Sequence, residues 1–180
     1  MLGLKRGTVS LLPHQTYWEE NAAQTIKLLR TVLDGVAIDI QHIGSTAIRH
    51  ICAKPIIDLA VGVRHLDDIT PLLPQLESIG VIYRNADHPG QQLFVMGDFE
   101  NEIRTHHIHV VEIENPAWNN YINFRDYLNG YPEKAKLYDD LKQSLFHQHA
   151  DNRGIYTAGK QELIAQLLKE ASQCKAQNLL

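Results

Sequence analysis

A glycine–serine turn between two strand-like segments most constrains the fold of this 180-residue chain. Residues 36–43 alternate between apolar and polar side chains, which predicts a strand with one buried face. The triplet 44–46 ends that strand, and we expect a short helix over residues 47–52. Residues 54–63 are β-branched and nearly all apolar, which indicates a second, more deeply buried strand. The sequence therefore predicts strand, turn, short helix and strand in direct succession.

A long helix is expected before the first strand. Thr16 and Glu19 have the spacing of a capping box, with a hydroxyl at the start and a carboxylate three residues later. Apolar residues then recur at helical spacing from Ala22 to Leu33, and Gly35 can end the helix. These signals predict one amphipathic helix near the N-terminus.

The middle of the chain predicts one helix and several short strands. Residues 67–78 favour a helix whose start is made irregular by Pro71 and Pro74. A turn-rich stretch covers residues 85–91. Short apolar runs indicate strands over residues 81–83, 92–96 and 104–113.

Helices dominate after residue 115. Asn115 as a cap, followed by Pro116, predicts a helix start, and the pattern stays helical to residue 175 with breaks near 129–130 and 151–154. This order predicts the α+β class, with a mixed sheet, flanking helices and a C-terminal helical segment. We expect an α+β core over residues 1–115 and a helical region over 116–180, packed together as one compact unit.

Composition excludes several classes of protein. The net charge is -4 and the basic residues are scattered, so the sequence gives no strong signal for nucleic-acid binding. The two cysteines are far apart and form no CxxC pair, which favours a reducing compartment. No apolar stretch approaches the ~18 residues that a membrane span requires. We therefore expect a soluble, cytoplasmic protein without a membrane partner.

The turn and the second strand carry chemical groups suited to a phosphate. Gly44 allows close approach of a ligand, and Ser45 and Thr46 bring hydroxyls and free N–H groups to a helix start. Asp58 lies in an apolar strand and shares a face with Lys54, so a metal ion or a cation is its expected partner. Alternatively, Gly-Ser is an ordinary turn, and Lys54 and Asp58 neutralise each other at a strand edge.

Two segments carry a resemblance to known proteins: HIGST at 42–46 and AKPIID at 53–58. Together they resemble the signature of the DNA polymerase beta-like nucleotidyltransferases, in which a Gly-Ser pair precedes a strand with metal-binding carboxylates. They resemble the GrpB family still more closely, from about Leu11 to Ala171. Weaker matches lie at Trp18, His107, His109, residues 124–128, residues 138–142, Tyr156 and Lys160.

The resemblance implies a nucleotidyltransferase-like fold that binds a nucleotide or phosphorylated small molecule with a divalent metal ion. The second acid of such enzymes is replaced by Ala60, and the GrpB pattern shares this change, which puts two-metal nucleotidyl transfer in doubt. The superfamily fold implies that Asp58 lies beside His107 and His109. A carboxylate and two imidazoles would suit zinc as well as magnesium or manganese. Alternatively, both histidines are simply hydrogen-bonded residues of a strand; Glu112 is expected on its other face.

The helical region of related two-domain enzymes closes over the nucleotide, which implies contacts from Arg125, Tyr156 and Lys160. Tyr156 and Lys160 are four residues apart and share a helix face if the helix begins that early. The alternative is that Arg125 pairs locally with Asp126 or Asp139 and that Tyr156 only packs.

Several functions are compatible with these patterns. The first is nucleotidyl transfer to an acceptor that the sequence does not identify: Ser45 would bind phosphate, Asp58 a metal, Lys54 developing charge, and His107 or His109 would be a ligand or general base. The second is an inactive nucleotide-binding or accessory module, linked to coenzyme A or nucleotide metabolism because GrpB-like domains occur fused to dephospho-coenzyme A kinase. A histidine-triad hydrolase, with Thr105 at the first triad position, and a plain interaction protein fit less well.

Overall fold

A mixed β-sheet forms the centre of the molecule. The computed structural model describes residues 2–84, 90–150 and 152–177, and within them six strands form one sheet in the order β2-β3-β6-β5-β4, with β1 beside β6. β3 and β6 are parallel and the other pairs are antiparallel. The strands are β1 (Leu4–Lys5), β2 (Asp39–Ile43), β3 (Ile57–Val63), β4 (Ile82–Arg84), β5 (Gln91–Asp98) and β6 (Ile103–Glu112).

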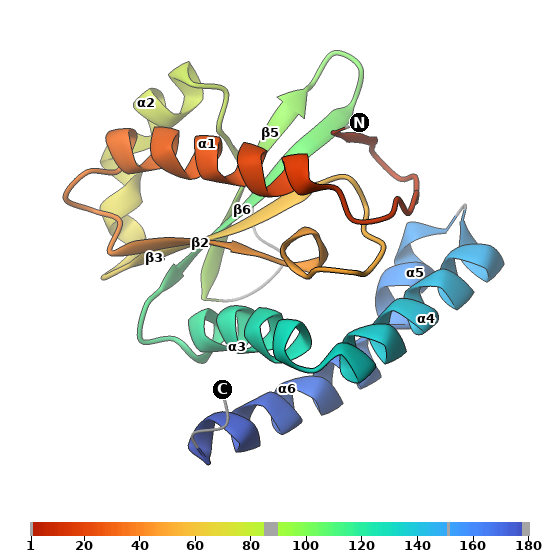
Figure 1. Ribbon diagram of the computed structural model, residues 1–180. Helices are drawn as coiled ribbons and strands as arrows, with labels where there is room; N and C mark the ends of the chain where they lie inside the picture. Colours follow the sequence, from red (N-terminus) through yellow and green to blue (C-terminus); the bar gives the residue numbers. More distant parts are fainter. Residues whose placement is uncertain (1, 85–89, 151, 178–180) are drawn as a thin grey trace.

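Helices cover both faces of this sheet (Figure 1). α1 (Thr16–Val32) and α2 (Leu73–Ser78) lie on one side, and α3 (Pro116–Gly130) lies on the other. The chain continues from α3 into α4 (Pro132–His149), α5 (Arg153–Ala158) and α6 (Gln161–Ala176). Two 3-10 helices, η1 (Ser45–Ala47) and η2 (Leu66–Leu72), follow β2 and β3. No helix in the described residues has the length and apolarity that crossing a membrane requires.

Side chains alternate along β3 and β6, so one face of these strands packs in the main core. The opposite face, toward α3, is called the chemical face. Leu59 and Val61 of β3 and Ile108 of β6 are buried in the main core with Trp18 and Leu29 of α1. Burying a side chain of this size contributes about 1.5–3 kcal/mol. The intervening residues of both strands point to the opposite face. α1 therefore closes one face of the sheet, and Asp58 of β3 with His107 and His109 of β6 face α3 and the helices after it.

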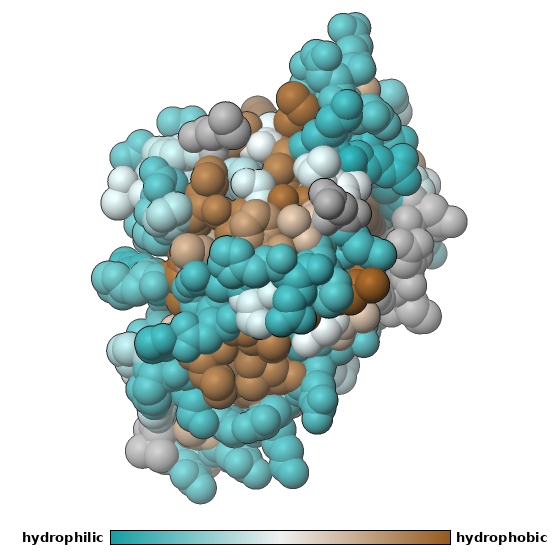
Figure 2. All heavy atoms as spheres, turned by 90° about the vertical axis from the view of Figure 1, so that its right-hand side faces the viewer, coloured by the Kyte–Doolittle hydropathy of each residue, from teal (hydrophilic) through white to brown (hydrophobic). Residues whose placement is uncertain are grey.

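The C-terminal helices share a second core with the segment after η1. Figure 2 shows the side of the molecule on which α4 and α5 lie; hydrophobic atoms gather there in two areas, separated by a band of hydrophilic residues. The buried members of this core come from α3, α4, α6 and the chain after η1: Tyr127, Leu128, Ala135, Tyr138, Leu167, Ala171, Ile48 and Ile51. Because Ile48 and Ile51 belong to this cluster, the loop between β2 and β3 is held by the helical region.

A buried lysine fastens the same loop to α4. Lys142 is 1% exposed. Its Nζ atom lies 3.2 Å from Oδ1 of Asp139 and donates to the carbonyl oxygen of Cys52. The N–H of Cys52 donates in turn to Oδ1 of Asp139 at 2.8 Å. The backbone of Cys52 is therefore clamped by both members of a buried ion pair, two residues before Lys54.

The fold class predicted from the sequence is confirmed, and so is the helix start at Asn115, whose Oδ1 atom accepts from the N–H of Ala117 at 2.9 Å. The capping box at Thr16 is wrong. Gln15 is the N-cap and no side chain caps α1, because Thr16 already has helical backbone and cannot act as the cap. The turn-rich stretch predicted over 85–91 falls mostly on residues 85–89, which lie outside the described part.

The short helix predicted over residues 47–52 is also wrong. Only Ser45–Ala47 is helical, Ile48 is extended and His50 has a positive φ of 64°. An irregular path lets both Ile48 and Ile51 reach the second core, which outweighs local helix propensity. The strand predicted over 54–63 begins only at Ile57, so Lys54 lies in the loop before β3.

Candidate functional site

The glycine turn after β2 packs directly against the carboxylate of β3. Gly44 has a positive φ of 69°, and a Cβ atom placed there would lie 2.5 Å from Oδ2 of Asp58. Ile43 of β2 pairs with Asp58 in the antiparallel register. Only glycine meets both demands, a left-handed backbone and close approach to a side chain. The turn and Asp58 therefore form one unit.

We expect Gly44→Ala to destabilise the protein by roughly 2–4 kcal/mol, because it combines left-handed strain with displacement of Asp58. Gly35→Ala is the matched control: Gly35 has a φ of 75°, and a Cβ atom there would meet nothing within 4 Å. Urea unfolding of both variants separates the backbone cost from the contact with Asp58. Equal losses for the two variants would contradict the close packing of the turn on Asp58.

A cavity of about 450 Å³ lies between the chemical face of the sheet and the C-terminal helices. This size is within the range of small-molecule sites. Its wall combines the glycine turn, the polar residues of β3 and β6, and side chains of α3 to α6. The lining residues are Ile43, Gly44, Ser45, Thr46, Lys54, Ile56, Asp58, His107, His109, Asn120, Tyr121, Phe124, Tyr138, Lys142, Arg153, Tyr156, Thr157, Lys160, Ile164 and Leu168.

Asp58 and His107 form a hydrogen-bonded pair on the floor of this cavity. The two residues are partners in the parallel register of β3 and β6, and Nδ1 of His107 lies 3.2 Å from Oδ1 of Asp58. Burial alone would raise the pKa of Asp58, but the hydrogen bond and the charges of His107, His109 and Lys54 outweigh it and lower that pKa. The carboxylate is therefore ionised at neutral pH. The resemblance implied that the strands carrying Asp58 and His107 are neighbours, and the pairing of β3 with β6 confirms this.

His109 lies further along the same face of β6, opposite Ala60 of β3. Its Nδ1 atom is 3.4 Å from the hydroxyl of Tyr121, which donates to Oε1 of Gln91 at 2.8 Å. Burial and the charge of Asp58 raise the pKa of Tyr121 to about 12, so its hydroxyl stays protonated. His109 is therefore oriented toward α3, whereas His107 is oriented toward Asp58.

Two lysines flank a buried tyrosine in the wall of the cavity. The Nζ atoms of Lys54 and Lys160 lie 4.8 Å and 4.6 Å from the ring centre of Tyr156, which is 1% exposed. Burial and the charge of Arg153 lower the pKa of Lys54 to about 8. Burial and the charges of Lys54 and Lys142 lower the pKa of Lys160 to about 7. The wall therefore concentrates positive charge that the protein does not fully neutralise.

Two cationic residues of the wall were not singled out from the sequence as site residues, Lys142 and Arg153. A signal for Lys142 exists, because it continues the buried stripe of α4 formed by Ala135, Tyr138 and Asp139. A lysine on such a stripe needs an acidic partner, and Asp139 is three residues away. Arg153 starts α5 and has no comparable local signal, since only the folding of α5 over the sheet brings it to the cavity.

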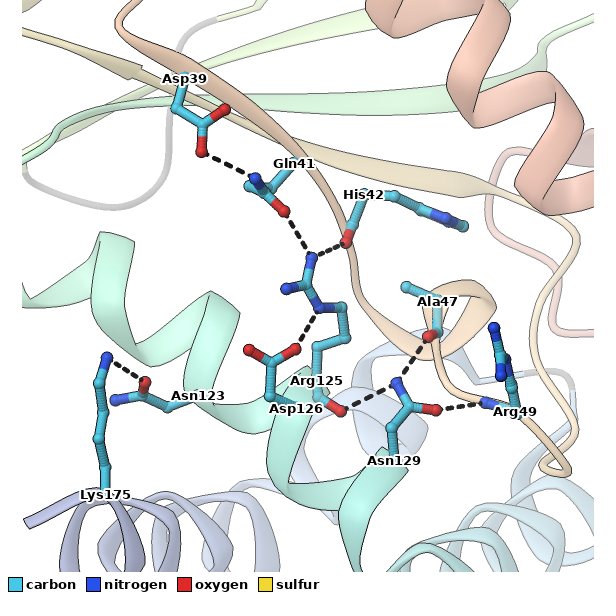
Figure 3. Close-up of polar contacts among 10 residues, drawn as sticks. All are labelled: Asp39, Gln41, His42, Ala47, Arg49, Asn123, Arg125, Asp126, Asn129 and Lys175. Atoms are coloured by element: carbon cyan, nitrogen blue, oxygen red, sulfur yellow. Dashed lines mark hydrogen bonds and ion pairs between the residues drawn. The ribbon is translucent and has the colours of Figure 1, made fainter. Parts of the chain in front are cut away.

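The structure places Arg125 outside the cavity. Its Nη1 atom donates to Oε1 of Gln41 at 2.8 Å and to the carbonyl oxygen of His42 at 2.9 Å, and its Nε atom donates to Asp126 at 2.7 Å (Figure 3). One turn later in α3, the Nδ2 atom of Asn129 donates to the carbonyl oxygen of Ala47. α3 therefore fastens the chain on both sides of the glycine turn, and Arg125 positions the site from outside.

Thr46 lines the cavity but its hydroxyl has a partner elsewhere. Oγ1 of Thr46 lies 2.9 Å from Nε2 of His42, and burial lowers the pKa of that histidine to about 4. The ring of His42 is therefore neutral, and its hydrogen bond with Thr46 stabilises the glycine turn. Ser45 shares a side-chain hydrogen bond with Tyr138 of α4. Of the two hydroxyls, that of Ser45 is the one directed to the helices around the cavity.

Comparison with known proteins identifies the family. The model of the family described as GrpB protein matches residues 8–170. This chain belongs to the GrpB family. It is 37% identical to the glutamate-rich protein GrpB of Alkalihalophilus pseudofirmus over 94% of this chain and 99% of that protein. It is 34% identical to UPF0157 protein YqkA of Bacillus subtilis over 93% of this chain, which spans only 48% of YqkA.

Solved structures agree with this family and fold. A crystal structure of conserved protein GrpB from Enterococcus faecalis matches with a TM-score of 0.82 and 30% identity over 90% of this chain and 96% of that one. A structure of the Cid1 poly(U) polymerase with MgGTP bound matches with a TM-score of 0.51 and 12% identity, over 76% of this chain and 44% of Cid1. The second match shows that this GrpB family member shares the nucleotidyltransferase fold.

The residues of this GrpB family member do not fit a pair of metal ions held by carboxylates. Ala60 follows Asp58 on the cavity face, and His107 and His109 occupy the adjacent positions of β6. Among the described residues, no three His, Cys, Asp or Glu side chains are grouped closely enough to hold a metal ion as they stand. A single metal ion held by Asp58, His107 and His109 stays a prediction.

Proposed function

We propose that this protein binds a nucleotide or another phosphorylated small molecule in the cavity between the sheet and the C-terminal helices. The observation that carries the proposal is the cationic wall formed by Lys54, Lys142, Arg153 and Lys160. Lys142 is matched by Asp139. The other three form no ion pair with a residue in the described part of the chain.

In proteins, ammonium and guanidinium groups are the usual partners of phosphate oxygens, and their attraction to phosphate is strongest where water is partly excluded. The hydroxyl of Ser45 adds a neutral donor at the glycine turn. Apolar and aromatic side chains such as Phe124, Ile164 and Leu168 complete the wall and suit the uncharged part of a ligand. The Cid1 polymerase, which shares the fold, was solved with MgGTP bound.

The Asp58–His107 pair favours a transfer reaction as a second, narrower function. When Nδ1 of His107 donates to Asp58, its Nε2 atom can accept a proton. In nucleotidyl transfer, the acceptor's hydroxyl oxygen would bond to the α-phosphorus while the bond from that phosphorus to the bridging oxygen breaks. Diphosphate would leave beside Lys54 and Lys160, and the hydroxyl proton would pass to His107. The alternative within the same fold is a binding or accessory module that performs no transfer.

Isothermal titration calorimetry tests the binding proposal with matched nucleosides and nucleotides. We expect nucleotides to bind and nucleosides not to bind. Arg153→Met should weaken nucleotide binding about tenfold, the cost of losing one charge-assisted contact. Arg30→Met is the control, since Arg30 lies on α1 across the sheet and pairs with Asp39. Absence of binding by every nucleotide and phosphorylated coenzyme A precursor tested would overturn the proposal.

Asp58→Asn separates transfer from simple binding. If the pair is catalytic, we expect the variant to retain ligand binding and to lose turnover about 100-fold or more. The assay would follow release of diphosphate from nucleoside triphosphates, with magnesium, manganese or zinc present in separate runs. Turnover unchanged in Asp58→Asn would exclude the catalytic role, and no turnover in the wild-type protein would leave the binding module as its function.

A further inference from the structure

The cationic wall indicates how the protein neutralises the charge of the ligand. Lys54, Arg153 and Lys160 all line the cavity that contains Asp58, and Asp58 already shares its Oδ1 atom with His107. In the metal-dependent arrangement of this fold, carboxylates hold divalent cations that face the phosphates. Here one carboxylate remains, with Ala60 and His107 at the neighbouring positions of β3 and β6. The charge available to a phosphate chain therefore comes from side chains.

We propose that Lys54, Arg153 and Lys160 take the place of the divalent cations, so that the site binds a di- or triphosphate group directly as a metal-free polyanion. This inference rests on the proposed function, since it concerns how the same cavity holds its phosphorylated ligand.

The geometry of the lysines suits a chain of phosphates better than a single one. Both Nζ atoms lie within 5 Å of the ring centre of Tyr156, at 4.8 Å and 4.6 Å. Tyr156 is 1% exposed, so both ammonium groups lie against a buried ring in the wall. Each ammonium has three donors and the guanidinium has five. Such a set can saturate several phosphate oxygens at once.

The charges of the wall also favour a ligand with several phosphate groups. Three cationic groups without an ion pair in the described residues face one carboxylate that is partly satisfied by His107. A single phosphate group carries about 1.5–2 negative charges at neutral pH, fewer than the three positive charges of the fully protonated wall. Each added phosphate group supplies further charge and further acceptors. Affinity should therefore rise along the series from one to three phosphates.

The experiment uses inorganic probes, so that no base or acceptor contributes. Orthophosphate, diphosphate and tripolyphosphate are titrated into the full-length protein by calorimetry at constant ionic strength, first in EDTA and then with excess magnesium. We expect affinity in EDTA to rise about tenfold with each added phosphate, and magnesium to weaken binding because it competes for the same oxygens. The double variant Lys54→Met/Lys160→Met should flatten the series, whereas Lys27→Met on α1, an exposed lysine, should not.

Three results would overturn the inference. They are tripolyphosphate binding only when magnesium is present, equal affinity for one and three phosphates in EDTA, and an unchanged series in the double variant. In each case the proposed function survives if nucleotides still bind and Arg153→Met still weakens them. Failure of both the inorganic probes and the nucleotides would remove the proposed function as well, so the two failures are distinguishable. Circular dichroism of the double variant checks that it folds.

Discussion

Replacing Lys160 by methionine is expected to weaken binding of the phosphorylated ligand about 10- to 100-fold while raising the melting temperature of the ligand-free protein. The loss of affinity follows from removing one charge-assisted hydrogen bond, worth about 1.5–3 kcal/mol. The gain in stability follows from the charges around Lys160. Burial and the neighbouring charges of Lys54 and Lys142 lower its pKa to about 7, so at neutral pH the folded state holds a charge that it disfavours.

The sign of the stability effect is fixed by linkage. A lysine whose pKa is lower in the folded state than in the unfolded state costs stability in full below the folded pKa, and the cost fades between that value and the unfolded pKa. Near pH 7 the cost is largely present. Methionine keeps most of the side-chain volume and removes the charge, so we expect a gain of about 1 kcal/mol, or about 2–4 °C in a chain of this size.

Differential scanning calorimetry of the ligand-free protein and titration with tripolyphosphate measure the two effects. Lys27→Met, on the outer face of α1, should change neither quantity by much because Lys27 is exposed. A fall in melting temperature for Lys160→Met would mean that the contact of Lys160 with Tyr156 stabilises the protein more than the clustered charge destabilises it. Such a result would contradict the description of the wall as an unneutralised cationic site.

The parts of the site that could be predicted from the sequence are those fixed by local periodicity and by a short motif. The alternation of β3 puts Asp58 on one face with Ala60, and the alternation of β6 puts His107 and His109 on one face. The Gly-Ser motif singled out Gly44, expected to allow close approach of a ligand, and its φ of 69° is one that glycine adopts readily. These features need no knowledge of which segments pack together.

The remaining parts depend on packing between segments far apart in the sequence. Lys142 and Arg153 reach the cavity only because α4 and α5 fold back over the sheet. Tyr156 and Lys160 were expected to share one helix face, but the helix breaks between them, since α5 ends at Ala158 and Lys160 precedes α6. The Nζ atom of Lys160 nevertheless lies 4.6 Å from the ring centre of Tyr156. For Arg125 the structure shows the alternative, a local pair with Asp126. Its guanidinium group also donates to the carbonyl oxygen of His42 in β2, which turns it away from the cavity.

The dependence of ligand affinity on pH should distinguish a lysine site from a metal site. In the ligand-free protein the pKa of Lys54 is about 8 and that of Lys160 is about 7. A bound phosphate chain favours the ammonium forms and raises both pKa values, so binding takes up protons above pH 7. The lowered pKa of Asp58 keeps its carboxylate ionised over this range.

Affinity should therefore fall as the pH rises, by up to about tenfold per pH unit for each lysine above its own pKa, or roughly 500-fold between pH 7 and pH 9. Above pH 7 the terminal phosphate is already largely ionised, so the slope reports the protein. Calorimetry in buffers of different ionisation enthalpy measures the proton uptake directly. Lys160→Arg is the decisive variant: an arginine remains charged, so it should keep binding and leave only the shallower fall that Lys54 produces around and above pH 8. A slope that is unchanged in Lys160→Arg would assign the proton uptake to another group, and an affinity that rises with pH would point to a ligand held by a metal ion rather than by the lysines.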